Sequence, residues 1–190
     1  MSIAERTTHR WTVDELYRVA ETGVFNHQRL ELIDGELVEM LPLGYPHVVA
    51  VAKSESVLRD VFGKSYWVRT QVPLRLNDLN EPMPDVNVVK GRITDYTNHP
   101  TSALLVVEIS SGTLRADLGE MASLYASAGI LDYWVIDLRK RCLYVLRDPV
   151  RSRKHKFGFF YDMVEQLDRS KRVSPLARAK SKITVADLLP

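Results

Sequence analysis

The sequence has 190 residues, of which 45% are hydrophobic and 26% charged, and its formal net charge at pH 7 is +2. These values are typical of one soluble domain covering residues 1–190, with about 11–188 structured and 1–10 forming a flexible N-terminus. No apolar run is long enough to span a membrane, and the N-terminus lacks the apolar segment of a secretory signal, so we expect a cytoplasmic protein. The single cysteine, Cys142, excludes an internal disulfide and a cysteine-based zinc site.

The charges are unevenly distributed along the chain. Residues 1–138 contain 12 Lys and Arg against 19 Asp and Glu, whereas residues 139–190 contain 14 against 5. A basic C-terminal part joined to an acidic N-terminal part suits a protein that binds a polyanion and needs carboxylates for its chemistry. A solvated surface that keeps the protein in solution explains the charges equally well.

The first third of the chain predicts a helix, a hairpin, a second helix and a strand. Thr12 followed by Glu15 forms a capping box, which indicates a helix start. Asp34-Gly35 lies between two apolar-rich arms and predicts a two-residue hairpin turn. Apolar residues at helical spacing follow Pro46 and predict a helix over 47–62. The alternating run YWVRTQVPLRL predicts a strand over 66–76.

The centre of the sequence predicts two strands and a helix. Pro84 favours an extended entry into the strand PDVNVV, which places Asp85 at its start. SALLVVEIS, residues 102–110, is nearly continuously apolar and predicts a buried strand. A helix is expected from Asp117 to Gly129. Further strands are expected at DYWVID, CLYVLR and FGFFYDM, and a short helix at TVADLL. This order favours an α/β or α+β fold with a central mixed sheet flanked by helices.

Three acids interrupt apolar strands: Glu31, Asp85 and Glu108. If the two central strands pair antiparallel, Asp85 and Glu108 meet at one edge of the sheet. Carboxylates at close range repel each other, and a hard divalent cation such as Mg²⁺ relieves that repulsion. A cation held in this way can polarise a phosphodiester and lower the pKa of an attacking water. Each acid taken alone is more often a surface-facing strand residue or a member of an ion pair, whereas the three together favour a functional cluster.

Several segments together resemble the Uma-two family of restriction-endonuclease-like proteins, in the PD-(D/E)XK nuclease superfamily. Pro84-Asp85 followed by an acid after a hydrophobic run has the superfamily spacing. The other matching segments are RLELIDGELVEM, the helix that starts at His47, LLVVEISSGT, ADLGEMASLYASAGILDYWVID and a late SPL. The resemblance extends from Trp11 to the C-terminus.

The resemblance implies a restriction-endonuclease-like core, a mixed sheet with flanking helices preceded by an N-terminal helix and hairpin. It also implies a site that binds Mg²⁺ or Mn²⁺, a DNA substrate and a homodimer. Glu31, Asp85 and Glu108 match the catalytic acids, with Asp85 and Glu108 as metal ligands. His47 matches a histidine usual at that helix start, with a possible ligand role. Asp117 also matches the family, as do three aromatic residues: Tyr125, Tyr133 and Trp134. The simplest role of these aromatic residues is core packing.

One expected catalytic residue is absent. The superfamily lysine commonly follows the second acid by two positions, where this chain has Ser110. Similar proteins place it on the following helix, at the position of Met121. Three cations are candidates to replace it, and we take Lys53 as the first choice because its helix begins at His47; the others are Lys90 and Arg115. A substitute cation is one explanation for the absent lysine. The other two are that the metal alone supports slow hydrolysis and that the protein has lost catalysis.

The sequence therefore favours a metal-dependent endonuclease acting on DNA. The basic segment Arg139–Lys182 would hold phosphates, with Arg151, Arg153, Lys154 and Lys156 as candidate contacts. The alternative is a catalytically inactive nuclease-fold protein that binds DNA or regulates a partner, which Met121 favours. An enzyme acting on another phosphodiester uses the same metal chemistry and remains a third candidate.

Overall fold

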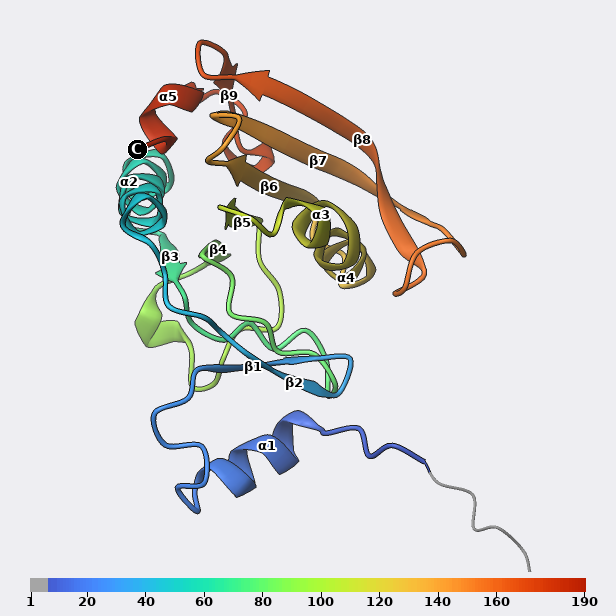
Figure 1. The fold of residues 1–190 in the computed structure, drawn as a ribbon. Coiled ribbons are helices and arrows are strands. Elements are labelled where there is room, and N and C mark those ends of the chain that lie inside the picture. The colour runs from blue at the N-terminus through green and yellow to red at the C-terminus, as the bar shows by residue number, and fades with distance from the viewer. Residues whose placement is uncertain (1–6) are drawn as a thin grey trace, which may run out of the picture.

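The computed structural model describes residues 7–190, so the predicted flexible stretch 1–10 falls mostly outside the described residues. Its centre is a six-stranded sheet in the order β3-β4-β5-β6-β7-β8 (Figure 1). The strands are β3 Tyr66–Thr70, β4 Val86–Lys90, β5 Leu105–Ser110, β6 Asp132–Asp137, β7 Cys142–Arg151 and β8 Phe159–Asp168. Only β5 and β6 pair parallel; all other neighbours pair antiparallel. The predicted mixed sheet is confirmed.

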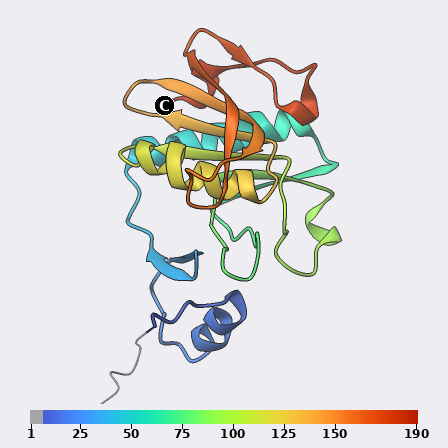
Figure 2. The same ribbon diagram turned by 90° about the vertical axis from the view of Figure 1, so that its right-hand side faces the viewer.

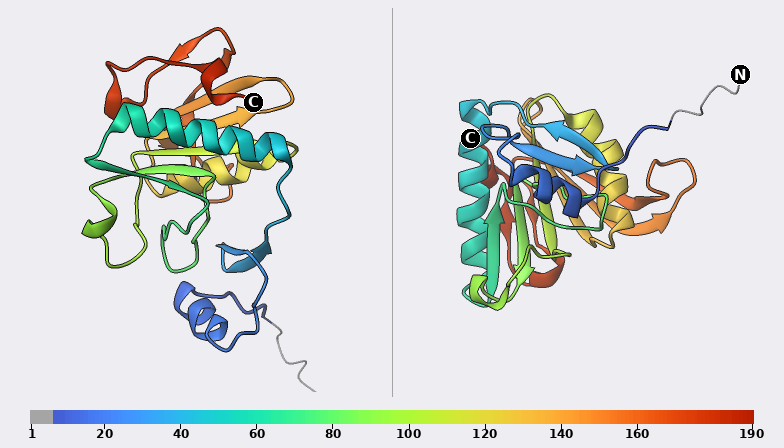
Figure 3. Two further views of the ribbon diagram at one scale, coloured as in Figure 1. Left: turned by 90° about the vertical axis from the view of Figure 1, so that its left-hand side faces the viewer. Right: turned by 90° about the horizontal axis from the view of Figure 1, so that it is seen from below.

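Helices cover both faces of the sheet. The long helix α2, Tyr45–Phe62, runs across one face and contacts β3, β4, β5 and the C-terminal helix α5, Val185–Leu188 (Figure 3). On the other face, α3 (Leu114–Ala116) and α4 (Ala122–Ser127) flank one π-helical turn, Asp117–Met121 (Figure 2). Because β4 and β5 are covered on both faces, their apolar side chains are buried, as the continuous apolar run of β5 indicated.

The N-terminal part forms an arm beside the sheet. Helix α1, Val13–Ala20, has the predicted capping box between Thr12 and Glu15. Strands β1, Leu30–Ile33, and β2, Glu36–Glu39, form the predicted hairpin, and Asp34 and Gly35 have the positive φ values of 55° and 75° that its turn requires. A backbone bridge between Leu32 and Glu81 ties the arm to the long β3–β4 loop. The remaining elements are the short strands β9 Arg172–Val173 and β10 Ile183–Thr184 and the 3₁₀ turns Ile93–Asp95 and Leu176–Arg178.

Several predicted boundaries are wrong, and two of them affect the site. The strand expected over 66–76 ends at Thr70, because Gln71 has a left-handed backbone with φ 51° and Pro73 follows. The helix expected from Asp117 begins at Leu114 instead, so Asp117 lies in the π-helical turn rather than at a helix start. Within residues 7–190, no helix is both long and apolar enough to cross a membrane.

Candidate active site

Asp85 and Glu108 lie opposite each other at the edge of the sheet where β4 begins. The antiparallel register pairs Val86 with Val107, so the residues one step further along each strand also meet. The Asp85 N–H donates to Glu108 Oε2 at 3.2 Å, and the Ile109 N–H donates to Asp85 Oδ2 at 2.9 Å. The sequence predicts that the two acids meet only if the two central strands pair antiparallel. The structure has this antiparallel pairing.

Two side chains from other elements hold the second oxygen of Asp85. His47, in the first turn of α2, places Nε2 2.8 Å from Asp85 Oδ1, and Gln71 donates from Nε2 to the same oxygen at 3.1 Å. His47 and Asp85 are only 7% and 6% exposed, so water does not compete for this contact. An ionised Asp85 requires the proton of His47 on Nε2. His47 is thus a hydrogen-bond partner of Asp85, and its role as a metal ligand stays a prediction.

Gln71 is a site residue that sequence analysis missed. Its left-handed backbone is uncommon for a residue with a side chain, and such conformations concentrate at functional sites. The Gln71 N–H donates to the carbonyl oxygens of Pro84 and Asp85 at 3.0 and 3.3 Å. These bonds end β3 beside the start of β4 and bring the Gln71 amide to Asp85. In the sequence, Gln71 is only one more polar residue in an alternating run.

Glu31, Tyr125 and Asp117 surround the central pair. The Met83 N–H donates to Glu31 Oε1 at 2.7 Å, which holds the β1 acid against the segment that leads into β4. The Tyr125 hydroxyl donates to Glu108 Oε1 at 2.6 Å. Tyr125 is fully buried, so it packs in the core, as the sequence suggested, and also orients Glu108. The structure thus brings all three predicted acids to one place, and Asp117, which the family resemblance also includes, lies close enough for its charge to raise the pKa of Glu108 and Glu31.

The acidic side chains of the site carry more negative charge than the surrounding groups neutralise. Burial raises the pKa of Glu108 well above its usual value, and the charge of Asp85 raises it further. Burial also raises the pKa of Glu31, although the Met83 N–H opposes this, and the charges of Asp85 and Asp117 add to the rise. The pKa of Asp117 is raised by burial as well. It is costly for these carboxyl groups to be ionised at the same time, and a bound cation would stabilise their ionised forms.

The donor set fits a magnesium-like ion that keeps part of its water shell. Within residues 7–190, no three His, Cys, Asp or Glu side chains converge closely enough to enclose a metal by themselves. Mg²⁺ does not require such a cage, because it is usually bound by one or two carboxylates, waters and substrate phosphates. Asp85 and Glu108 each accept hydrogen bonds on both oxygens, and Glu108 retains acceptor capacity on each of them.

A family model described as "Uma2: Putative restriction endonuclease" matches residues 13–175. The chain belongs to the Uma2 family. A crystal structure described as "a putative nuclease belonging to DUF820", from Anabaena variabilis ATCC 29413, has the same fold, with a TM-score of 0.69 and 17% sequence identity. The similarity covers 93% of this chain and 96% of that one. No curated protein matches the sequence.

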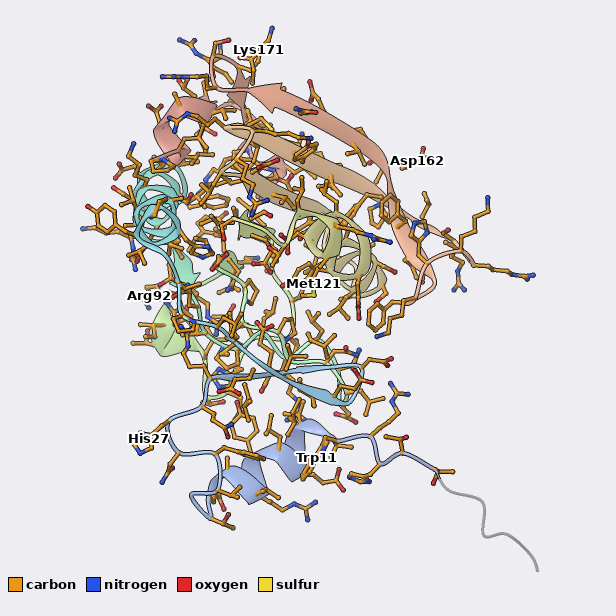
Figure 4. The ribbon with its side chains drawn as sticks, viewed as in Figure 1. Trp11, His27, Arg92, Met121, Asp162 and Lys171 are labelled. Atoms are coloured by element: carbon orange, nitrogen blue, oxygen red, sulfur yellow. The ribbon has the colours of Figure 1, made fainter. Side chains whose placement is uncertain are left out.

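In this Uma2 chain, Met121 ends the π-helical turn, on the helix that also carries Tyr125. Tyr125 follows Met121 by one helical turn, and residues four apart lie on one helix face. Because Tyr125 reaches Glu108, a long side chain at position 121 points toward the same carboxylates. Met121 is half-buried among apolar neighbours, on the side of the helix turned toward the β1–β2 hairpin (Figure 4). π-Helical turns are rare and frequently occur at functional sites.

None of the proposed substitute cations reaches the carboxylates. Lys53, our first choice, donates its ammonium to the Leu189 carbonyl oxygen at 2.6 Å. The reason is helix geometry: six residues after His47, the chain has turned by about 600°, which leaves Lys53 about 120° away from the His47 face. Lys90 ends β4, at the end opposite Asp85, and Arg115 is exposed on α3. The expectation that Lys53 approaches Asp85 is wrong.

The four predicted phosphate contacts lie on the β7–β8 hairpin. Arg151, Arg153 and Lys154 are exposed there, whereas Lys156 forms ion pairs with Glu120 at 2.7 Å and Asp34 at 3.5 Å. These pairs tie the hairpin to the π-helical turn and to the β1–β2 turn. The basic hairpin therefore lies alongside elements that carry site residues.

We expect the substitution Glu108→Gln to stabilise the metal-free protein, and the gain to grow as pH rises. A carboxyl whose pKa is raised in the folded state keeps its proton where the unfolded chain has lost it, so its contribution to stability falls as pH rises above about 4.5. Glutamine cannot ionise and escapes this loss. Urea unfolding in a chelator between about pH 5 and 8 measures the difference. A difference that is constant with pH contradicts the expected repulsion.

Proposed function

We propose that this Uma2 protein is a divalent-metal-dependent endonuclease that hydrolyses phosphodiester bonds in DNA. The observation that carries the proposal is the close, mutually repelling pair of the buried Asp85 and the half-buried Glu108, reinforced by Glu31 and Asp117. A structural ion pair would include a matching cation, whereas this cluster holds acids whose pKa values are raised. Membership of a family described as "Putative restriction endonuclease" supports the same reaction class.

Asp85 and Glu108 are the residues that would hold Mg²⁺ or Mn²⁺. The ion would supply charge neutralisation at the scissile phosphate and a water of lowered pKa. The chain's own residues fix both ligands: His47 and Gln71 orient Asp85, and Tyr125 orients Glu108. Such bonds to ligating carboxylates restrict their rotation and tune their basicity.

Glu31 is suited to accept a proton from the attacking water. Its pKa is raised by burial, and a general base works best when its pKa approaches the working pH. The Met83 N–H donates to Oε1 of Glu31, and no protein group in the described part of the chain donates a hydrogen bond to Oε2. Glu31 thereby assists the metal ligands, in the role that the sequence suggested.

The direct test is conversion of a supercoiled plasmid in the presence of Mg²⁺ or Mn²⁺. We expect nicking that a chelator abolishes and that the double variant Asp85→Asn, Glu108→Gln lacks. Purification of that variant in parallel controls for contaminating nucleases. Equal conversion by wild type and double variant would reject the enzymatic proposal.

We expect the basic β7–β8 hairpin to hold DNA through its phosphates. Replacing Arg153 and Lys154 by Ser should weaken binding to all sequences about equally and reduce the slope of log affinity against log salt by about two. Fluorescence anisotropy with a labelled duplex in a chelator measures both quantities. Replacement of Arg169 and Lys171, which lie in the turn at the other end of β8, is the matched control. An unchanged slope in the hairpin variant would contradict this role.

The second candidate is a nuclease-fold protein that binds DNA without cleaving it. Met121 favours it, because methionine neither carries charge nor accepts a proton, and Lys53 is engaged at Leu189. This candidate predicts salt-sensitive DNA binding with no metal-dependent nicking. Homodimerisation, which the family resemblance implies, stays a prediction that sedimentation can test.

A further inference from the structure

The β7–β8 hairpin extends beyond the rest of the sheet as a two-stranded ribbon. Strand β6 pairs with β7 only as far as Arg147, whereas β7 and β8 stay paired up to Arg151 and Phe159. Residues 148–161 therefore continue past the end of β6. In Figure 1 and in the right-hand view of Figure 3, the end of this ribbon reaches out past α4. The ribbon offers a partner a narrow end rather than a flat face.

The end of the ribbon is strongly basic. Residues 149–161 contain four Lys and Arg side chains and no Asp or Glu. Two of the four, Arg153 and Lys154, are exposed in the connecting loop, and no acidic side chain of residues 7–190 forms an ion pair with either of them. Exposed cations without acidic partners are available to phosphate groups. The charge of the ribbon therefore suits a polyanion such as DNA.

The loop at the end of the ribbon, residues 152–158, is held in shape by its own contacts. The Ser152 N–H donates to the Gly158 carbonyl oxygen at 2.8 Å, and the Gly158 N–H donates to the His155 carbonyl oxygen at 3.0 Å. The Ser152 hydroxyl lies 2.7 Å from Nδ1 of His155, whose ring stacks on that of Phe160 with centroids 4.1 Å apart. A loop that is ordered before it binds loses less conformational entropy on binding.

The same loop is fixed relative to the acids of the candidate active site. The Phe157 N–H donates to the Ser123 hydroxyl oxygen at 3.1 Å, which attaches the loop to α4. Ser123 is two residues before Tyr125, whose hydroxyl donates to Glu108 at 2.6 Å. One short helix therefore contacts both the ribbon and the acid cluster, so a DNA molecule bound by the ribbon lies close to the acids.

Duplex DNA has a groove of the size that such a ribbon needs. The major groove is about 12 Å wide and admits a two-stranded β-ribbon, whereas the minor groove is only about 6 Å wide. Paired strands are about 4.8 Å apart, so two strands with their side chains fill the major groove and exceed the minor one. A row of phosphates borders the groove on each side. A single strand has no such groove and only one row of phosphates.

We infer that the DNA substrate is a duplex and that the end of the β7–β8 ribbon enters its major groove, where Arg153 and Lys154 bind the bordering phosphates. The inference rests on the proposed function, to which it adds the form of the DNA and the way in which the DNA docks. Contacts to phosphates fix the position of a protein on the duplex without reading its sequence. The ribbon therefore positions the duplex at the acids and leaves sequence preference to other contacts.

The test is binding of labelled DNA in a chelator, measured by anisotropy, with each groove blocked in turn by an uncharged group. One duplex carries glucosylated 5-hydroxymethylcytosine, whose substituent lies in the major groove, and a second carries N2-benzylguanine, whose substituent lies in the minor groove. We expect the first modification to weaken binding by about tenfold or more and the second by less than about twofold. A single strand of the same sequence should bind at least about tenfold more weakly than the unmodified duplex.

Two variants assign the effect to the ribbon. When Arg153 and Lys154 are replaced by Ser, the unmodified duplex and the duplex blocked in the major groove should bind about equally, because the contacts that the block displaces are already lost. Replacement of Arg169 and Lys171 by Ser, in the turn at the other end of β8, should leave the full tenfold difference. All four positions are in exposed turns or loops, so both variants should keep the melting temperature of the wild type.

Several results would overturn the inference. A major-groove block without effect, or a single strand that binds as tightly as the duplex, removes the groove contact, while metal-dependent plasmid nicking keeps the proposed function intact. An undiminished effect of the block in the variant that lacks Arg153 and Lys154 assigns the groove to another part of the protein. Absence of binding to both duplex and single strand overturns the groove contact together with the proposed DNA substrate.

Discussion

Replacing Met121 with lysine is expected to raise the rate of metal-dependent DNA cleavage by about 10²-fold or more above the wild-type rate. Position 121 lies one turn before Tyr125, whose hydroxyl is 2.6 Å from Glu108, so a lysine ammonium there can approach the carboxylates. It would stabilise the charge that develops on the phosphoryl group and orient the attacking water. Plasmid nicking with Mg²⁺ measures the gain.

Two further substitutions show whether the gain depends on the lysine chemistry. Met121→Leu preserves the apolar contacts and should leave the rate unchanged. Met121→Arg supplies positive charge but does not deprotonate, so it should give a smaller gain than lysine. Met121→Lys should also raise the melting temperature in a chelator, because it offsets the repulsion among the acids. A folded, stabilised Met121→Lys variant without faster cleavage would show that position 121 is not the missing catalytic part.

The parts of the site that follow from local sequence rules could be predicted. Asp85 comes directly before β4, where Pro84 marks the strand start, and Glu108 lies inside β5, which the apolar run before it marks. Asp34-Gly35 fixes the hairpin that carries Glu31, because its turn requires positive φ at both residues. The family resemblance added His47, whose position at a helix start no periodicity argument would select.

The parts that depend on tertiary contacts could not be predicted. Gln71 reaches Asp85 only because its backbone adopts a left-handed conformation, which nothing in the alternating pattern signals. The helix begins at Leu114, and Asp117–Met121 forms a π-helical turn within it, which no pattern of apolar residues in this segment indicates. Lys53 follows His47 closely along the chain, which makes it a candidate for the catalytic lysine. The direction of its side chain, however, is set by the rotation of α2 between the two residues.

The arrangement of the arm explains how separate elements form one site. Glu31 is on β1, which the Leu32–Glu81 bridge and the Met83 N–H bond to Glu31 tie to the β3–β4 loop. Lys156 joins the same hairpin to the π-helical turn through Asp34 and Glu120. Both pairs are partly exposed and each contributes about 1 kcal/mol or less. The arm is held mainly by its backbone bonds to the β3–β4 loop, among them Gly35 N–H to the Leu79 carbonyl oxygen at 2.9 Å and Glu81 N–H to the Leu32 carbonyl oxygen at 2.7 Å.

Replacing Asp85 with asparagine is expected to lower metal-dependent cleavage by about 10³-fold or more, because it removes one of two charged ligands of a cation that contributes several kcal/mol. Asparagine can still accept the Ile109 N–H and contact His47, so the fold should persist. The variant should also lose the rise in melting temperature that Mg²⁺ gives the wild type. Asp162→Asn, an exposed position on β8, is the matched control (Figure 4). Retained cleavage or an undiminished Mg²⁺ response in Asp85→Asn would place the metal elsewhere.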